Sequence, residues 1–299
     1  MFSYRGSVII TYHLKALTGL RVGGSVENFE IGGLDSPVIK TTAPIPKFYQ
    51  DGTDMPEGTP YIPGSSIKGK MRSSLEWLLG NVDKMLENKK KILEERGKPE
   101  EKNKKYIENA GKPCDCGRCS VCIVFGTGDQ NTIQNIAGEN PKELPGPPRL
   151  KVFDAYLTKE SLEVLQEITQ GLLTEIKTEN QINRITSRAH PRKVERVPAG
   201  AIFEGKMVFE LYKEGDEDRL NLVFTGMRAL EDSYLGGYGS RGSGRVKFEN
   251  IRLIYRPKAY YLGIAQENEI GKFGSLADIK DQEIIKELEE ITGKPKNAG

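Results

Sequence analysis

"IFEGKMVFELY" (residues 202–212) alternates between apolar and polar side chains, which is the pattern of a strand buried on one face. "DRLNLVFTGMRALEDS" (218–233) follows it, with apolar residues at helical spacing. "RVKFENIRLIY" (245–255) alternates again, and its phase shifts near Asn250, which indicates a β-bulge. The three segments predict a strand, a helix and a strand. The inward side chains expected for the first strand are Phe203, Met207, Phe209 and Leu211.

The first half of the chain predicts a second set of core elements. Residues 7–17 alternate as a half-buried strand, and a helix is expected to begin at Ser65 or Ser66, which are good N-caps. "RLKVFDAYL" (149–157) then reads as a strand. Without insertions the order is βαββαβ, the ferredoxin-like α+β pattern that RRM domains share. The expected inward residues are Ile10, Tyr12, Leu14 and Ala16 in the strand, and Ile67, Met71, Leu75, Leu78, Leu79, Val82 and Leu86 in the helix.

The remaining segments outweigh this core, so function is expected in them. We interpret residues 1–299 as one domain with a C-terminal helical tail (264–299) that contains a helix at about 281–292. The run from Lys84 to Lys112 is mostly Lys, Glu and Asn, and it predicts either a solvated helix extension or a mobile insertion. The insertions are residues 20–64, 84–145 and 174–198.

The composition is typical of a soluble globular protein, with 37% hydrophobic and 29% charged residues. A net charge of +2 gives no bulk attraction for polyanions, so such a site has to come from local clusters. We recognise no signal peptide and no segment of membrane-spanning length. All four cysteines lie within nine residues, which argues against a secreted disulfide framework. We expect a cytoplasmic protein without membrane contact.

The strongest local signal is "CDCGRCSVC" (114–122). Four thiolates this close together suit one tetrahedral Zn²⁺ ion, and backbone N–H groups near Gly117 can hydrogen-bond the sulfurs. Because four protein ligands leave no open position, the zinc is expected to be structural. The alternatives are an iron–sulfur cluster, four unrelated thiols, or a site in which His13 or His190 replaces one cysteine. The expected ligands are Cys114, Cys116, Cys119 and Cys122.

"YIPGSSIKGKMRS" (61–73) places positive charge in the first turns of a helix, where the macrodipole disfavours it. A phosphate bound by the Ser65 and Ser66 hydroxyls and the free N–H groups would explain this placement. A solvated basic face is the alternative. The cations concerned are Lys68, Lys70 and Arg72.

Two further segments are basic. "YLGGYGSRGSGRV" (234–246) is dense in glycine, so its backbone can approach a ligand closely and donate N–H groups. "NQINRITSRAHPRKV" (180–194) has no acid, and its Ile182 and Ile185 have no evident core to join. This predicts a projecting hairpin that grips a phosphate chain with isoleucine as a wedge between bases. Flexible, solvated loops are the alternatives. The candidates are Gly236, Gly237, Gly239, Arg241, Gly242 and Arg245, and Arg184, Arg188 and Arg192.

Together the three basic segments favour a single-stranded nucleic acid as ligand. The strands lack the aromatic residues with which an ordinary RRM stacks bases. We therefore expect binding to the backbone without reading of the sequence.

Seven motifs resemble, in order, the backbone-subunit family of type III-A CRISPR (Csm) effector complexes, within the RAMP superfamily. The resemblance covers nearly the whole chain, although the 84–112 run and the tail after about Gly263 are not distinctive of it. The motifs are "LTGLRVGG", "GGLDSPVI", "YIPGSSIKGKMRSSLE", "CDCGRCSVC…FG", "RLKVFDAYLT", "ENQINRITSRAHPRKVERVPAG" and "LGGYGSRGSGRVKFE".

The resemblance implies a modified RRM core in which residues 20–64 form a lid, 84–145 a helical and zinc-loop insertion, and 174–198 a thumb. Copies are implied to stack along the CRISPR guide RNA, beside other Csm subunits, with each thumb kinking the guide–target duplex. The basic helix start and the glycine-rich loop look like the family's guide-binding surface. Arg21 joins the RNA-binding candidates. Many relatives carry histidine there, so no histidine role is carried over.

"NFEIGGLDSPVI" (28–39) contains Asp35 in a sequence typical of a turn. The resemblance implies that one aspartate on the loop after the first strand cleaves target RNA with a divalent metal, and Asp35 matches it. A lone carboxylate needs Mg²⁺ or Mn²⁺ to organise phosphate and water, and a kinked substrate.

The predicted function is therefore cleavage of complementary single-stranded target RNA within the assembled complex. The alternatives are a non-catalytic RNA-binding scaffold, with the nuclease elsewhere, and a stand-alone guide-processing ribonuclease. The last is disfavoured because the chain has only two histidines.

Overall fold

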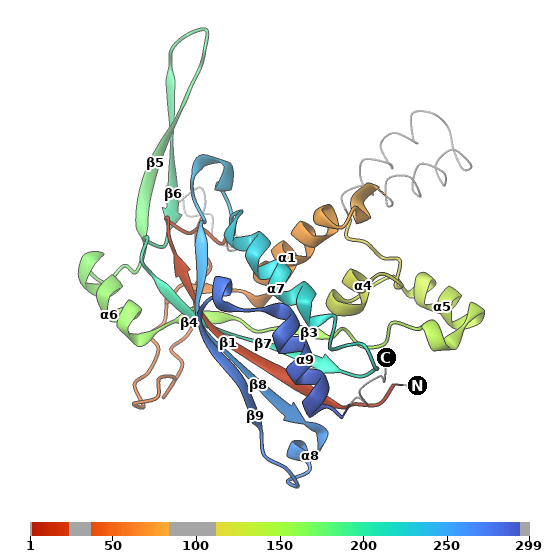
Figure 1. Ribbon diagram of the computed structural model, residues 1–299. Coiled ribbons are helices and arrows are strands. Elements are labelled where there is room, and N and C mark those ends of the chain that lie inside the picture. Colours follow the sequence, from red (N-terminus) through yellow and green to blue (C-terminus); the bar gives the residue numbers. More distant parts are fainter. Residues whose placement is uncertain (1, 24–36, 84–111, 294–299) are drawn as a thin grey trace, which may run out of the picture.

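The computed structural model describes residues 2–23, 37–83 and 112–293 (Figure 1). Asp35 and residues 84–111 lie outside these ranges. The strands are β1 Gly6–Ala16, β2 Tyr61–Ile62, β3 Leu150–Val152, β4 Ala155–Leu157, β5 Glu175–Ile182, β6 Ala189–Arg196, β7 Ile202–Leu211, β8 Val246–Pro257 and β9 Asn268–Ser275. The α-helices are α1 Gly64–Leu78, α4 Ser120–Phe125, α5 Gln130–Glu139, α6 Lys159–Ile168, α7 Leu220–Glu231, α8 Lys258–Tyr261 and α9 Asp281–Ile291. Short 3₁₀ helices are η1 Pro141–Glu143, η2 Gly239–Arg241 and η3 Leu276–Asp278.

A seven-stranded antiparallel sheet forms the centre of the molecule (Figure 1). Its order is β2-β4-β7-β1-β8-β9, and β3 also pairs with β7. The four predicted core strands are, in chain order, β1, β3 with β4, β7 and β8. In the sheet they lie in the order fourth, first, third, second. This is the strand order of a ferredoxin-like sheet, so the predicted α+β fold is confirmed.

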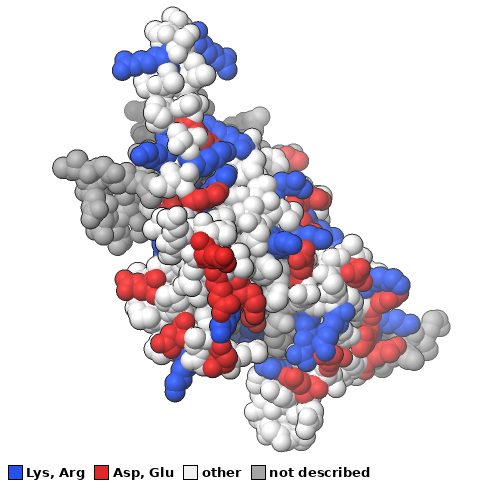
Figure 2. All heavy atoms as spheres, turned by 90° about the vertical axis from the view of Figure 1, so that its left-hand side faces the viewer, with Lys and Arg blue, Asp and Glu red and all other residues white. Residues whose placement is uncertain are grey.

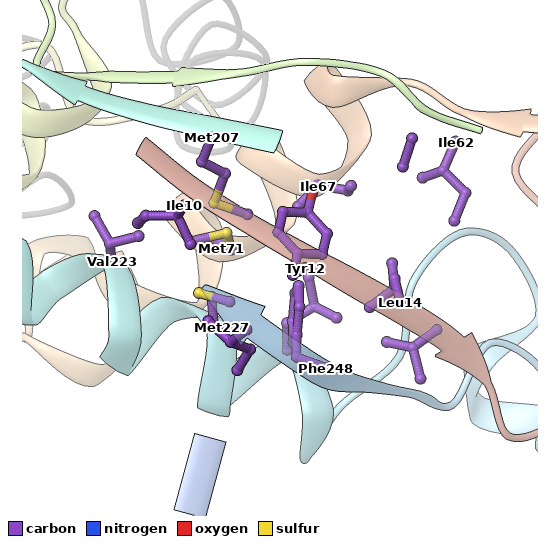
Figure 3. Packing of buried hydrophobic residues seen from close by; sticks show 14 of the residues in the cluster. Ile10, Tyr12, Leu14, Ile62, Ile67, Met71, Met207, Val223, Met227 and Phe248 are labelled. Carbon is purple, nitrogen blue, oxygen red and sulfur yellow. The ribbon is translucent and has the colours of Figure 1, made fainter. Parts of the chain in front are cut away.

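Helices α1 and α7 pack on one face of this sheet and enclose the core (Figure 3). The side chain of Met71 in α1 lies near those of Val223 and Met227 in α7, and Ile67 of α1 lies near the ring of Tyr12 of β1. All five are at most 1% exposed, so burial of these apolar stripes holds the two layers together. The ring of Tyr12 also packs edge-on against Phe248, with centroids 5.1 Å apart.

The bulge expected near Asn250 is present. Asn250 has φ +50°, and the pairing of β1 with β8 shifts register between Thr11 and His13. Asparagine tolerates this left-handed conformation better than most residues do. The shift lets both parts of β8 keep their apolar side chains on the helix side.

Several expected boundaries are wrong. Helix α1 ends at Leu78, which is 63% exposed, because the chain turns at Gly80 with φ +66°. Its start lies at Gly64, whose N–H donates to Asp154 Oδ1 at 2.7 Å, so neither serine is the cap. Residues 149–157 form two short strands, β3 and β4, rather than one.

The C-terminal tail is also not wholly helical. Asn268–Ser275 adds β9 to the edge of the sheet beside β8, whereas α9 matches the helix expected at about 281–292. Among the described residues, no helix is long and apolar enough to cross a bilayer.

The segments between core elements have their own structure. Strands β5 and β6 pair only with each other and form a two-stranded hairpin, which we call the thumb hairpin (residues 175–196); it projects from the sheet (Figure 1). Helix α6 precedes it and is capped by Thr158. Helix α4 begins within the cysteine motif and contains Cys122, and α5 follows it. Both lie on the opposite side of the molecule from α6 (Figure 1).

A buried ion pair joins β3 to the loop before α7. Arg149 Nε donates to Asp216 Oδ2 at 2.9 Å, and their side chains are at most 1% exposed. The same carboxylate accepts bonds from the backbone N–H groups of Tyr212 and Lys213 and from Arg219 Nη1. Such a network is stable only when complete, because each remaining charge would otherwise be buried without a partner.

Asp216→Ala is therefore expected to lower the free energy of unfolding by about 3–5 kcal/mol. Asp218→Ala, at an exposed position on the same loop, should change it by less than about 0.5 kcal/mol. Urea denaturation followed by circular dichroism measures both. Equal effects would contradict this role for the ion pair.

Candidate nucleic-acid interface and metal centre

The thumb hairpin presents two different faces. In its antiparallel register Glu179 lies opposite Arg192, so both side chains point to the same face. Arg192 donates to Gln181 at 2.8 Å on that face, and Glu179 forms ion pairs with Lys177 and with Arg241 of the glycine-rich loop. The polar face of the hairpin therefore adjoins the glycine-rich loop.

The tip of the hairpin is a tight turn. Asn183 Oδ1 accepts the backbone N–H groups of Ile185 and Thr186 at 2.9 and 3.0 Å. Arg184 and Arg188 are exposed there, and Ile185 is 95% exposed. The predicted combination of exposed cations and exposed isoleucine is present, and its use in RNA binding remains a prediction.

The glycine loop (residues 236–244) closes on the backbone of Arg21. Gly237 N–H donates to the carbonyl oxygen of Arg21 at 2.8 Å. A Cβ on Gly236 would lie 2.0 Å from that oxygen, and Gly236 has φ +78°, so no other residue fits. Tyr238 lies near the guanidinium groups of both Arg21 and Arg241, 5.3 and 5.7 Å from its ring centroid.

The start of α1 reaches the same loop through Lys70. Its ammonium group lies 4.2 Å from the centroid of the Tyr234 ring, and burial lowers the Lys70 pKa. Ser65 is exposed and Ser66 half-buried in the same first turn. The glycine loop therefore links the three predicted basic segments, through Lys70 at the start of α1 and through Glu179 of the thumb hairpin. We call the candidate residues on these segments the basic surface, with Arg184 and Arg188 out at the hairpin tip (Figure 2): Arg21, Ser65, Ser66, Lys70, Arg184, Arg188, Arg192, Arg241, Arg245 and the glycine loop.

Lys68 and Arg72 point elsewhere, which corrects their assignment to that surface. Lys68 Nζ donates to the carbonyl oxygen of Leu150 at 2.7 Å, and burial, together with the charge of Arg72, lowers its pKa. Arg72 pairs with Glu76 at 2.9 Å and donates to the carbonyl oxygen of Cys114. Both cations serve internal contacts, because each is two residues from Lys70, which is about 200° of helix rotation and places them on the other side of α1.

The segment that contains Asp35 begins and ends beside this surface. Gly23 pairs with Val38, and Ile39 N–H donates to Val22 O at 3.0 Å, so the two ends lie together. Val38 N–H and Lys40 Nζ both donate to Glu195 at the base of the thumb hairpin, at 2.9 and 2.5 Å. Asp35 itself lies outside the described residues.

The opposite face of the sheet offers a different site. A cleft of 760 Å³ lies over β1 and β7, beside the start of α6. Its lining includes Phe48 and Tyr156 but also Asp51, Asp154, Glu160 and Glu204 against Lys159, Lys206 and His13. The acidic groups make this face unsuitable for a phosphate chain, in contrast to the sheet surface of an ordinary RRM.

The cysteines come together as a metal-binding group. All four Sγ atoms lie within 4.8 Å of one another, with Cys114 to Cys119 at 4.0 Å and Cys116 to Cys122 at 3.8 Å. Four sulfurs around a tetrahedral Zn²⁺ lie about 3.8 Å apart, given Zn–S bonds of about 2.3 Å. The donor set and its spacing therefore fit zinc.

Helix α1 fixes this loop. Glu76 accepts the Cys114 N–H at 2.9 Å and positions Arg72, which holds the Cys114 carbonyl. Cys119 and Cys122 N–H groups each donate to a cysteine sulfur at 3.4 Å. Hydrogen bonding from Cys114 lowers the pKa of Cys119 to about 7, which favours the thiolate that binds metal. His13 contacts Asn250 and His190 lies on β6, so neither histidine replaces a cysteine.

The comparisons with known proteins agree with this geometry. The model of the RAMP superfamily matches residues 13–247. A protein of Methanothermobacter thermautotrophicus named "CRISPR system Cms endoribonuclease Csm3" is 40% identical over 280 residues, which cover 92% of this chain and 97% of that protein. The chain belongs to the RAMP superfamily, in its Csm3 branch.

Further Csm3 proteins support this placement. One from Methanocaldococcus jannaschii is 35% identical, covering 97% of this chain and 96% of its own length. A chain of the crystal structure of a Csm3–Csm4 subcomplex of the type III-A CRISPR–Cas interference complex matches with 28% identity and a TM-score of 0.51, over 95% of this chain and 97% of that one. Methanopyrus kandleri Csm3, 19% identical with a TM-score of 0.51 over 98% of both chains, shares the fold.

Some contacts of this RAMP chain escaped the sequence reasoning. The ring of Tyr234 contacts Lys70, and the ring of Tyr238 contacts Arg241. The only sign of these roles in the sequence was that both tyrosines belong to the glycine-rich segment. Glu195 gave a weaker signal, as the one acid that follows the basic segment, between Val194 and Arg196.

The metal site leads to a direct test. The purified chain is expected to hold one zinc ion, measured by elemental analysis, and a chelator should release it while far-UV circular dichroism of the core persists. Cys116→Ser should lose the ion, because three ligands bind far more weakly than four. Asp115→Ala, in the same loop, should keep it. Absence of zinc from the wild-type chain, or iron in its place, would contradict the assignment.

Proposed function

We propose that this chain is the guide-binding backbone subunit of a type III-A CRISPR effector complex, and that it cleaves complementary target RNA through Asp35 with Mg²⁺ or Mn²⁺. The observation that carries the proposal is that the glycine loop contacts the start of α1, the thumb hairpin and Arg21, beside the two ends of the Asp35 segment. Its relatives are named endoribonucleases, which supports the reaction class.

The basic surface suits an RNA backbone rather than particular bases. Its groups are guanidinium and ammonium ions, hydroxyls and the backbone of the glycine loop, all of which contact phosphates and sugars. The open sheet face carries Asp51, Asp154, Glu160 and Glu204 beside Phe48 and Tyr156, and these carboxylates repel a phosphate chain. Binding without sequence preference is what a subunit needs when base pairing of the guide supplies specificity.

Asp35 is the candidate for the chemistry. It lies two residues before Pro37 in the sequence, so it is covalently tied to the junction of lid and thumb. A divalent metal bound by the carboxylate would activate the attacking oxygen and stabilise phosphate charge. The exposed Ile185 at the thumb tip supports a kinked substrate, because an apolar wedge unstacks neighbouring bases.

The partners follow from the same proposal. These are the CRISPR guide RNA, a single-stranded target RNA, further copies of the chain and other Csm subunits. The crystal structure of a Csm3–Csm4 subcomplex concerns a relative and supports assembly with another subunit. Zn²⁺ is proposed as a structural ion that stiffens the helical insertion, away from the reaction.

The role of the glycine loop can be tested with Gly239→Ala. The added Cβ would lie 1.9 Å from the Tyr234 ring, so the ring and the Lys70 resting on it have to move. We expect about tenfold weaker binding of single-stranded RNA. Gly138→Ala on α5 is the control, since its Cβ meets nothing within 4 Å. Fluorescence anisotropy with a labelled RNA measures both, and equal affinities would count against this surface.

The role of Asp35 is tested in the reconstituted complex with a guide and a complementary RNA. Asp35→Ala should abolish cleavage that depends on Mg²⁺ or Mn²⁺, by at least about 10²-fold, and keep target binding. Glu57→Ala, an exposed carboxylate of the same insertion, should cleave normally. Unimpaired cleavage by Asp35→Ala would favour the non-catalytic scaffold, as would cleavage that survives EDTA.

A further inference from the structure

The turn that follows α1 brings a buried amide to the cysteine loop. Asn81 Nδ2 lies 3.6 Å from Cys119 Sγ, a distance at which an amide N–H donates a hydrogen bond to sulfur. Asn81 is 8% exposed, and a buried polar side chain of this kind requires a partner. Gly80, with φ +66°, makes the turn that precedes it. The Asn81 amide therefore donates to a sulfur that the proposed zinc ion also binds.

This contact differs from the other N–H bonds to sulfur in the cysteine loop. The N–H groups of Cys119 and Cys122 that donate to sulfur belong to the backbone of the loop itself. Apart from the cysteines, Asn81 is the one side chain in the described ranges that donates to a cysteine sulfur. Cys119 Sγ accepts both the Cys122 N–H and the Asn81 amide. A substitution of Asn81 thus removes one donor and leaves all four ligands and the loop backbone in the chain.

Helix α1 and its turn contact the loop at two of the four ligands. Glu76 accepts the Cys114 N–H at 2.9 Å, whereas Asn81 donates to the Cys119 sulfur. The Sγ atoms of Cys114 and Cys119 lie 4.0 Å apart, so these contacts support one edge of the group of four sulfurs. Glu76 holds the backbone on this edge, and Asn81 acts on a sulfur atom directly.

The charge of a zinc–thiolate site explains what such a donor does. Four thiolates outweigh the charge of one Zn²⁺ ion, so the site is negative overall. An N–H bond to a sulfur offsets part of this charge, which disfavours protonation of the thiolate and its departure from the metal. An oxygen atom in the same place would repel the thiolate, so the amide of Asn81 has to present its nitrogen to Cys119.

We infer that Asn81 is a positioning residue of the zinc site, whose amide keeps Cys119 bound to the ion as a thiolate and slows release of the ion. This inference rests on the structural zinc proposed above for the four cysteines. Asn81 acts on a ligand and does not itself bind the metal. Its replacement therefore leaves one ion per chain but raises the rate at which that ion leaves. The alternative is that Asn81 only fills space, in which case a side chain of the same shape would serve equally well.

Two substitutions of Asn81 in the full chain separate hydrogen bonding from shape. Asn81→Leu keeps the branching of asparagine and has no donor, so it should release zinc to a coloured chelator about tenfold faster than the wild type. Asn81→Asp keeps the shape but sets a carboxylate against the thiolate, so it should release zinc faster still at neutral pH. If Asn81 only filled space, Asn81→Asp would behave like the wild type. Stopped-flow absorbance of the chelator complex measures the rates.

Cobalt in place of zinc gives a second readout, which a packing defect does not move. Co²⁺ bound to thiolates absorbs light by charge transfer from sulfur to the metal. Because a hydrogen bond stabilises the sulfur electrons, loss of the Asn81 donor should move this absorption to longer wavelength in Asn81→Leu. The d–d bands of the same spectrum report tetrahedral coordination, and they should show that the variant loop is intact.

Asn135→Leu is the matched control, because Asn135 is an exposed asparagine on α5 in the same insertion. It should release zinc at the wild-type rate. Wild-type release by Asn81→Leu, an unshifted cobalt absorption, or slower release by Asn81→Asp than by Asn81→Leu would overturn the role of Asn81 and leave the zinc site intact. A wild-type chain that holds no zinc would instead refute the zinc proposal, and the role of Asn81 with it.

Discussion

The buried carboxylate of Glu195 is the constraint on which the functional end of the molecule depends. It is 4% exposed and accepts hydrogen bonds from Val38 N–H, Lys40 Nζ and Thr174 Oγ1 at 2.9, 2.5 and 2.7 Å. Burial works to raise the pKa of Glu195, but these three donors outweigh it and lower the pKa. The charge therefore stays in place at neutral pH, and it holds the lid against the base of the thumb hairpin.

This junction lies where the segment that contains the proposed catalytic Asp35 begins and ends. Leu20 at the start of the lid pairs with Val197, and Val38 N–H, after the Asp35 segment, donates to Glu195, so the chain on both sides of Asp35 contacts the end of the thumb hairpin. Arg21 ties the glycine loop to the same point. The glycine loop, the base of the thumb hairpin and both ends of the Asp35 segment are thus joined by hydrogen bonds, and under the proposed function this junction would position a bound substrate.

The core was predictable because its residues follow simple periods. The alternation of Ile10, Tyr12 and Leu14, and the helical spacing of Ile67, Met71 and Leu75, led directly to the observed layers. The cysteine cluster was predictable for a similar reason, since its ligands are neighbours in sequence. The bulge at Asn250 was also predictable, because the apolar–polar alternation of the strand changes phase there.

The predictions that were wrong concern features that are set by contacts between residues distant in the sequence. The start of α1 is set by Asp154, ninety positions away, and β9 is a strand because the edge of β8 was free to pair with it. Lys68 and Arg72 looked equivalent to Lys70 in sequence, yet each points to an internal carbonyl oxygen. The roles of Glu195 and Tyr238 were missed for the same reason, because their partners, Val38 and Arg21, lie in distant segments of the chain.

The central claim is that RNA lies on the surface between the glycine loop and the thumb hairpin, and not on the open face of the sheet. Photo-crosslinking of single-stranded RNA that carries 4-thiouridine, mapped by mass spectrometry, tests it most directly. The account predicts crosslinked peptides that contain Tyr234 and Tyr238. Crosslinks concentrated on Phe48 and Tyr156 in the acidic cleft would contradict it.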